Sequence, residues 1–161
     1  MFLSRLNRNV VVPFDFSDLS VRTLKKSLEM VGDETLLRVI HVVEHPSTFD
    51  YGVSWESMSD ETFEARVNEA FVRRLKQFGD FPKLDLTIVV GNPGPQIAAF
   101  AQDVGAELIV MASKGRSGFE RFLLGSVAEK VLRMAACPVL VLRDLNVKKT
   151  KTNLGFANST A

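Results

Sequence analysis

The chain has 161 residues, of which 46% are hydrophobic, and its 20 basic and 19 acidic side chains leave a net charge of +1. This length suits one well-buried core and is too short for two ordinary domains, so we expect a single domain. The near-neutral charge excludes a global electrostatic preference for nucleic acid or an anionic membrane, so any anion site must be local. No apolar run reaches the ~20 residues that span a bilayer, and no signal peptide is recognisable. We expect a soluble, cytoplasmic protein.

The first elements are a strand and a helix. Residues 9–13 read NVVVP, a β-branched run typical of a fully buried strand. Ser17 or Asp18 can then cap a helix whose apolar residues recur near helical spacing as far as Val31. Gly32 follows as a glycine that ends the helix.

A second strand, a loop and a longer helix follow. The run TLLRVIHVV at residues 35–43 predicts the strand. Residues 44–58 contain Pro, Gly and several serines without periodicity, which indicates a loop and a candidate flap over a site. The sequence SDET at residues 59–62 begins an amphipathic helix with an apolar face that extends to Phe78. Residues 79–82 end it.

The next segments predict two more strands with a helix between them. Residues 84–90 (LDLTIVV) form the third strand, and residues 91–94 form a turn. Pro95 suits the first position of a helix that ends near Val104. Residues 108–111 (LIVM) form the fourth strand.

The last elements are a glycine-containing loop at residues 112–119, a helix at 125–136 and a fifth strand at 138–142. Strands that alternate with helices and read as continuous apolar runs predict an α/β fold, with a parallel sheet covered on both faces. After Arg143 the chain has too little apolar content to pack, so we expect a disordered tail over residues 144–161. Residues 1–8 are expected to be an N-terminal extension.

The single cysteine, Cys137, cannot form an internal disulfide. It lies between Ala136 and Pro138 at the start of an apolar run. We interpret it as a buried, reduced thiol and not as a nucleophile or redox sensor.

Open parallel sheets bind ligands beyond the carboxyl ends of their strands, where the strand order reverses. This rule selects residues 13–15, 42–43 and 112–119. Asp15 directly follows a buried strand, and its carboxylate could accept hydrogen bonds from a ribose hydroxyl or an adenine amino group. Alternatively, Asp15 only caps the following helix.

The segment after the fourth strand favours a phosphate site. Its glycines allow successive N–H groups to face one concavity, and a helix N-terminus adds further N–H groups and a partial positive charge. The residues concerned are Gly115, Gly118, Gly125 and Ser126, with Lys114 and Arg116 as nearby positive charges. The spacing of these glycines alone is equally consistent with a simple loop followed by an N-cap serine, Ser126. Neither a dinucleotide glycine fingerprint nor a P-loop is present.

Three segments carry a family resemblance. They are VVVPFDFSD, RVIHVV and LIVMASKGRSGFERFLLGSVAEKVLRMAACPVLVL, and together they resemble the universal stress protein family over residues 9–143. The resemblance implies a Rossmann-like sheet of strand order 3-2-1-4-5, a role in stress response, and a homodimer formed through the last strand, residues 139–142.

The resemblance also implies a site for ATP, or for AMP or ADP, which Mg²⁺ could accompany. Pro13, Phe14 and Asp15 would lie at the adenosine side, with Val42 against the base and Met111 at the end of the fourth strand. The backbone at Gly115, Gly125, Ser126 and Val127 would hold the phosphates.

This chain departs from the nucleotide-binding pattern at two positions. Ala112 stands at the first glycine of the pattern, and a methyl group there costs roughly 1 to 2 kcal/mol if the position requires a positive φ. Phe14 replaces a smaller residue, and its ring could stack on the adenine or occupy its place. The expected function is a nucleotide-binding regulatory dimer; the alternative is a nucleotide-free protein-interaction module whose pocket is altered at these two positions.

The sequence predicts no catalytic residue and no metal site. A hydrolase needs a base positioned for water and metal ligands beside the phosphates. His41 lies within the second strand and is interpreted as a core or edge histidine. Glu44 and His45 are the best candidates for a weak catalytic or metal role, and a slow ATPase remains an alternative.

Overall fold

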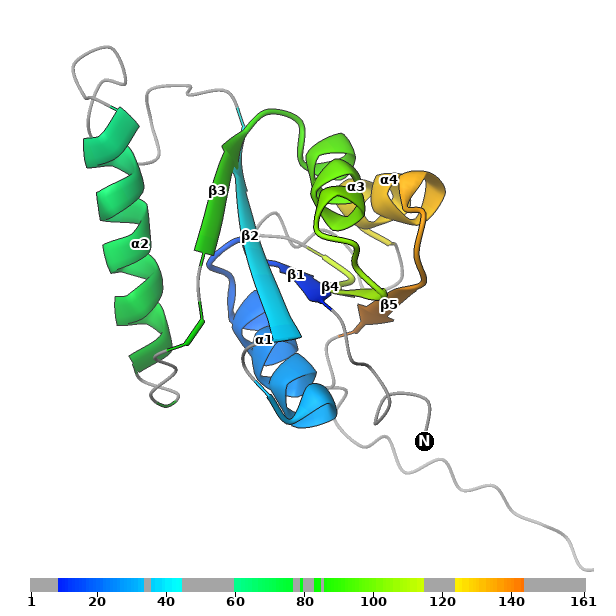
Figure 1. Ribbon diagram of the computed structural model, residues 1–161, viewed down its shortest axis with the longest axis horizontal. Helices are drawn as coiled ribbons and strands as arrows, with labels where there is room; N and C mark the ends of the chain where they lie inside the picture. The colour runs from blue at the N-terminus through cyan, green and yellow to red at the C-terminus, as the bar shows by residue number, and fades with distance from the viewer. Residues whose placement is uncertain are drawn as a thin grey trace, which may run out of the picture.

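A computed structural model describes residues 9–33, 36–44, 60–76, 79, 83–84, 86–114 and 124–143. Five parallel strands form one sheet in the order β3-β2-β1-β4-β5 (Figure 1). The strands are β1 (Val10–Pro13), β2 (Leu37–Val43), β3 (Leu86–Val90), β4 (Leu108–Ala112) and β5 (Val139–Leu142). The helices are α1 (Asp18–Val31), α2 (Asp60–Lys76), α3 (Pro93–Asp103) and α4 (Ser126–Met134). The predicted α/β fold and strand order are therefore confirmed.

The core consists of two apolar layers, one on each face of the sheet. The side chains of β1 alternate between them: Val10 and Val12 pack with α1 and α2, whereas Val11 packs with α3 and α4. Neighbouring strands alternate in the same way. Because both faces are covered, the strands read as continuous apolar runs in the sequence.

Helix α1 has the predicted signals at both ends. The Ser17 side chain accepts a hydrogen bond from the N–H of Ser20 at 3.1 Å, so Ser17 is the N-cap. Gly32 adopts a left-handed φ of 74° and donates its N–H to the carbonyl of Leu28 at 2.8 Å.

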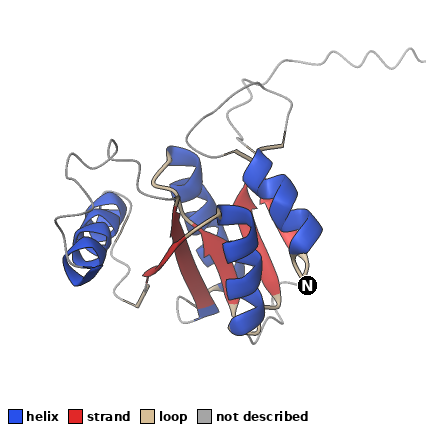
Figure 2. Cartoon of the chain, turned by 90° about the horizontal axis from the view of Figure 1, so that it is seen from above, coloured by secondary structure: helices blue, strands red, loops and turns tan. Residues whose placement is uncertain are grey.

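Helix α2 packs on the sheet through one apolar face and lies apart from the other helices in Figure 2. An ion pair between Arg74 and Asp18 joins it to the start of α1. The buried residues of its apolar face are Phe63, Val67, Phe71 and Leu75. The periodicity of the sequence predicted this face correctly; Phe78 lies outside the described residues.

Several element ends differ from the predicted bounds by one or two residues, and two helix ends show the reason. Helix α3 begins at Pro93, two residues before the predicted Pro95, because Asn92 already has the extended backbone of an N-cap. The fixed φ of proline suits the first helical position at Pro93 equally well. Helix α4 ends at Met134 and not at Ala136, because Ala135 turns to extended backbone.

Several predicted segments lie outside the described residues. They are the extension at 1–8, most of the loop at 44–58, most of the loop at 112–119 and the tail at 144–161. No helix of the described ranges is both long and apolar enough to cross a membrane.

Helices α3 and α4 approach each other closely at a glycine. A Cβ atom placed on Gly94 would lie 2.6 Å from the Cβ of Lys130 in α4, closer than real Cβ atoms come. The distance between the two helices therefore depends on the absence of a side chain at position 94.

Cys137 lies between α4 and β5 and is partly buried. The sequence analysis predicted a buried thiol, so its exposure is greater than predicted. Its contacts are with the apolar layer under α3 and α4. This burial raises the pKa of the thiol above its ordinary value.

Replacing Phe71 with alanine is expected to destabilise the protein by about 3 to 5 kcal/mol, because it leaves a cavity between α2 and the sheet. The matched control is Val72→Ala, one residue along α2, where the side chain is 51% exposed. This control should change stability by no more than about 0.5 kcal/mol. Urea unfolding followed by circular dichroism measures both, and equal losses would contradict the packing described for α2.

Alkylation of Cys137 by iodoacetamide is expected to be slower at pH 7.5 than alkylation of a free cysteine. Burial favours the neutral thiol, whereas the thiolate is the species that reacts. The rate should rise as the pH increases and the thiolate forms. A rate at pH 7.5 equal to that of an exposed cysteine in a peptide would contradict this expectation.

Candidate functional site

The carboxyl ends of three neighbouring strands meet at one edge of the sheet. Strand β1 lies between β2 and β4, with Pro13 opposite Ile40 and Val11 opposite Ile109. Parallel strands end on the same side, so the residues that follow β1 and β4 share one edge with the last residues of β2. The predicted site residues 13–15, 42 and 111–112 all lie at this edge.

Asp15 is held in a defined turn immediately after β1. Its Oδ1 accepts hydrogen bonds from the backbone N–H of Ser17 at 3.0 Å and from the Ser17 hydroxyl at 2.5 Å. A carboxylate has a second oxygen, Oδ2, which can accept a hydrogen bond from a ligand. The side chain is only partly buried. The cap of α1 is Ser17, so the alternative prediction that Asp15 caps the helix is wrong.

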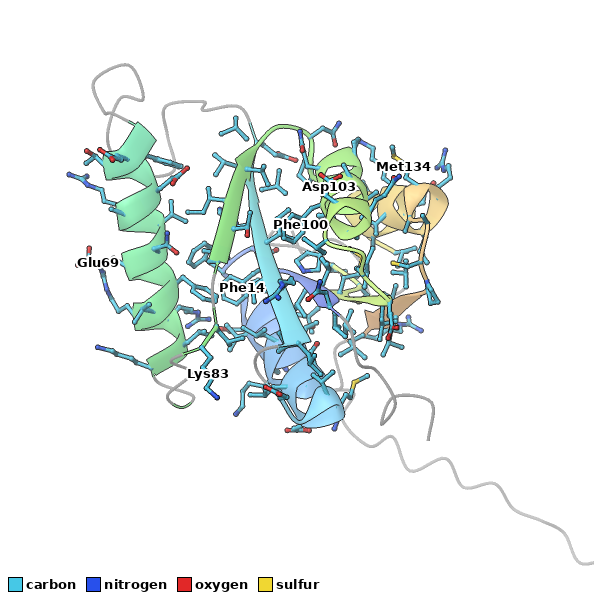
Figure 3. The ribbon with its side chains drawn as sticks, viewed as in Figure 1. Phe14, Glu69, Lys83, Phe100, Asp103 and Met134 are labelled. Atoms are coloured by element: carbon cyan, nitrogen blue, oxygen red, sulfur yellow. The ribbon has the colours of Figure 1, made fainter. Side chains whose placement is uncertain are left out.

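The ring of Phe14 points away from this edge and into the core, as Figure 3 shows. It is 2% exposed and contacts Phe71 of α2 edge to face, with the ring centroids 5.0 Å apart. The Phe14 ring can therefore neither stack on an adenine nor take its place, so both predicted arrangements are wrong. Side chains alternate along β1, so Phe14 faces α1 and α2, on the opposite face of the sheet from Met111.

The start of α4 lies directly against the end of β4. The N–H of Gly125 donates to the carbonyl of Ser113 at 2.8 Å. A Cβ atom on Gly125 would lie 3.1 Å from that carbonyl oxygen and 3.4 Å from the Cα of Lys114. A side chain at position 125 would therefore be crowded and would require these neighbours to shift by a few tenths of an ångström. The backbone itself does not require glycine, because its φ of −64° is open to any residue.

The first turn of α4 has N–H groups without an intrahelical acceptor. The intrahelical hydrogen bonds begin with the N–H of Glu129, which donates to the carbonyl of Gly125 at 2.9 Å. The earlier N–H groups, those of Ser126, Val127 and Ala128, have no acceptor within the helix, and no side chain of the described residues caps them. Together with the helix dipole they favour an anion.

Ala112 has ordinary strand geometry. It is the last residue of β4 and pairs with Leu142 of β5. Among the described residues, Phe16 is the only one other than glycine with a positive φ, so Ala112 pays no torsional penalty. The predicted loss of 1 to 2 kcal/mol depended on a positive φ and does not apply.

Two apolar side chains form the floor of the site on the side of α3 and α4. Val42 is partly buried and packs on that layer, while Met111 is 4% exposed and belongs to it. Gly115, predicted to contribute backbone donors, lies outside the described residues.

Two residues near Asp15, Phe16 and His41, were not predicted to belong to the site. Phe16 has a left-handed φ of 65°, a conformation that costs a residue other than glycine about 1 to 2 kcal/mol. His41 is 5% exposed and hydrogen-bonds through Nδ1 to the carbonyl oxygen of Phe14 at 2.8 Å. Nothing in the residue type of Phe16 predicts its backbone. The spacing of Asp15 and Ser17 could have indicated the turn, because aspartate commonly accepts from the residue two positions on.

No three metal-ligating side chains come together in the part of the chain that the structure describes. Glu44 is exposed at the end of β2, and His45 lies outside the described residues. The arrangement combines a helix N-terminus, a carboxylate held in a turn and two apolar side chains, Val42 and Met111.

Comparison with known proteins gives one consistent result. The model of the universal stress protein family matches residues 7–143. Universal stress protein MJ0531 of Methanocaldococcus jannaschii is 34% identical over 142 residues, covering 86% of this chain and 83% of that protein. Universal stress protein MJ0577 of the same organism is 27% identical over 163 residues, covering 89% of this chain and 99% of that protein.

Solved structures agree with the sequence matches. The structure of MJ0577 has a TM-score of 0.63 at 28% identity and covers 86% of this chain and 97% of its own. A universal stress protein crystallised in complex with cAMP has a TM-score of 0.55 at 26% identity, covering 84% of this chain and 96% of its own.

Gly125→Ala is expected to destabilise the protein by about 1 to 3 kcal/mol, because the added methyl group must push α4 away from Ser113 and Lys114. Ser126→Ala is the control: it removes a hydroxyl from an exposed residue next to the contact and should leave the melting temperature nearly unchanged. Thermal unfolding measures both, and a Gly125→Ala variant as stable as the wild type would contradict the close approach.

Proposed function

This chain belongs to the universal stress protein family, and we propose that it binds ATP or a related adenine nucleotide, AMP or ADP, at the carboxyl edge of its sheet. The observation that carries the proposal is the position of the first turn of α4 against the end of β4, one strand away from the fixed carboxylate of Asp15. No side chain in the part of the chain that the structure describes caps this turn. A related structure holds cAMP, which supports an adenine nucleotide as the ligand class.

In this proposal the two ends of the nucleotide meet different chemistry. The phosphates lie at the first turn of α4, where the N–H groups of Ser126 and Val127 and the Ser126 hydroxyl donate to phosphate oxygens. Gly125 permits the close approach, and Gly115 contributes backbone as the family resemblance implies. Mg²⁺ could accompany the phosphates.

The adenosine lies across the ends of β1 and β2. Asp15 accepts a hydrogen bond through Oδ2 from a ribose hydroxyl or from the adenine amino group, while Ser17 holds Oδ1. Pro13, Val42 and Met111 offer apolar surface to the base. The role of Phe14 is restricted to its backbone, since its ring is part of the core. That burial removes the reason to expect a pocket filled by Phe14, on which the nucleotide-free alternative depended.

We further propose that the protein acts in the stress response as a homodimer joined through β5. This strand is at an edge of the sheet, and all four of its residues, Val139–Leu142, are partly exposed although each is apolar. An apolar edge strand needs cover to avoid uncontrolled association.

Multi-angle light scattering is expected to give twice the chain mass of 17.9 kDa, and a monomer at micromolar concentration would contradict the dimer.

Asp15→Asn is expected to weaken ATP binding about tenfold. The amide oxygen keeps the hydrogen bonds from Ser17, which directs the NH₂ group toward a ligand donor where the carboxylate had offered an acceptor. Isothermal titration calorimetry with ATP and Mg²⁺ measures the affinity of each variant.

The control is Asp18→Asn, which makes the same change of charge three residues along the chain at a side chain 74% exposed. Its affinity should stay within about twofold of the wild type. Equal losses in both variants would point to charge alone, and absence of saturable binding by the wild type at millimolar ATP would overturn the proposed function.

A further inference from the structure

A buried histidine holds the backbone that leads into the Asp15 turn. His41 lies in β2, is 5% exposed, and places Nδ1 2.8 Å from the carbonyl oxygen of Phe14. A carbonyl oxygen only accepts hydrogen bonds, so Nδ1 carries the hydrogen and donates it. The N–H of Phe14 in turn donates to the carbonyl of Ile40 at 2.8 Å. Strand β2 therefore holds both polar groups of the peptide backbone at Phe14.

The residue on the other side of Asp15 is held against the same histidine. The ring of Phe16 packs edge to face on the imidazole of His41, with the centroids 4.9 Å apart, and on the ring of Phe14 at 5.1 Å. The left-handed backbone of Phe16 is unfavourable for an aromatic residue, so contacts with its surroundings must maintain it. His41 thus contacts the neighbours of Asp15 on both sides.

We propose that His41 is a positioning residue of the nucleotide site: by donating to the Phe14 carbonyl and supporting the Phe16 ring, it fixes the turn that presents the Asp15 carboxylate. This inference rests on the proposed function. His41 is too deeply buried to act as a ligand contact itself, and its effect passes through the backbone on either side of Asp15. A binding group that is held in place beforehand loses less freedom when the ligand arrives.

Two variants separate the hydrogen bond of His41 from the volume of its side chain. In His41→Leu the donor is lost and a buried carbonyl loses a partner, while an apolar side chain of similar size remains. In His41→Asn the side-chain amide nitrogen occupies the same place in the chain of bonds as Nδ1 and can donate to the same carbonyl. The matched control is Val39→Ala, two residues earlier on the same face of β2, which removes buried methyl groups without touching the turn.

The test measures ATP affinity by calorimetry and, without nucleotide, the backbone amide NMR shifts of Asp15, Phe16 and Ser17. His41→Leu is expected to weaken ATP binding about tenfold and to move these three shifts. His41→Asn should restore affinity to within about threefold of the wild type and return the shifts toward wild-type positions. Val39→Ala should lower stability and leave the affinity and the three shifts unchanged.

The possible failures can be told apart. If the wild type binds ATP and His41→Leu binds it equally well with unmoved shifts, the role of His41 is overturned while the proposed function stands. If His41→Asn fails to rescue a weakened His41→Leu, the hydrogen bond is not the cause and the positioning role is likewise overturned. If the wild type binds no nucleotide, the proposed function falls and this role falls with it.

Discussion

Strand β1 is buried from solvent on both faces, and Val10, Val11 and Val12 are no more than 1% exposed. A strand buried in this way needs hydrogen-bonded neighbours on both edges and helices above and below it. Strands β2 and β4 supply the neighbours, and the reversal of strand order falls between β1 and β4. Burial of this one short strand therefore sets the strand order in which the carboxyl ends of β1 and β4, the first followed by Asp15 and the second leading to α4, lie side by side.

The fold could be predicted from the sequence because the residues that begin and end each element act locally. The run NVVVP, the cap at Ser17 and the stop at Gly32 each reflect a requirement of the backbone at that point. Alternation of strands with helices then restricts the topology to a doubly covered parallel sheet. The boundaries of α3 were less certain because Pro93 and Pro95 both suit a first helical turn, and only the backbone of Asn92 decides between them.

The site was harder to predict than the fold, because it depends on where side chains point and on backbone angles, which residue type does not specify. The sequence indicated that an aromatic residue precedes Asp15, but the face on which its ring lies follows from the register of β1 and from the space beside Phe71. The same limit applies to Ala112, whose cost depended on a φ angle that residue type does not specify. His41 was predicted to be a core or edge histidine; the structure places it in the core, with its ring hydrogen-bonded to the backbone of Phe14 beside the proposed site.

The close contact between Gly94 and Lys130 restricts which side chains position 94 can carry. Position 94 is in α3, and a side chain there must displace Lys130 and with it α4, whose first turn carries the N–H groups proposed to bind an anion. Substitutions at this position would act on the ligand through helix spacing. The lack of a side chain at Gly94 thus sets the position of a helix in which Gly94 itself takes no part.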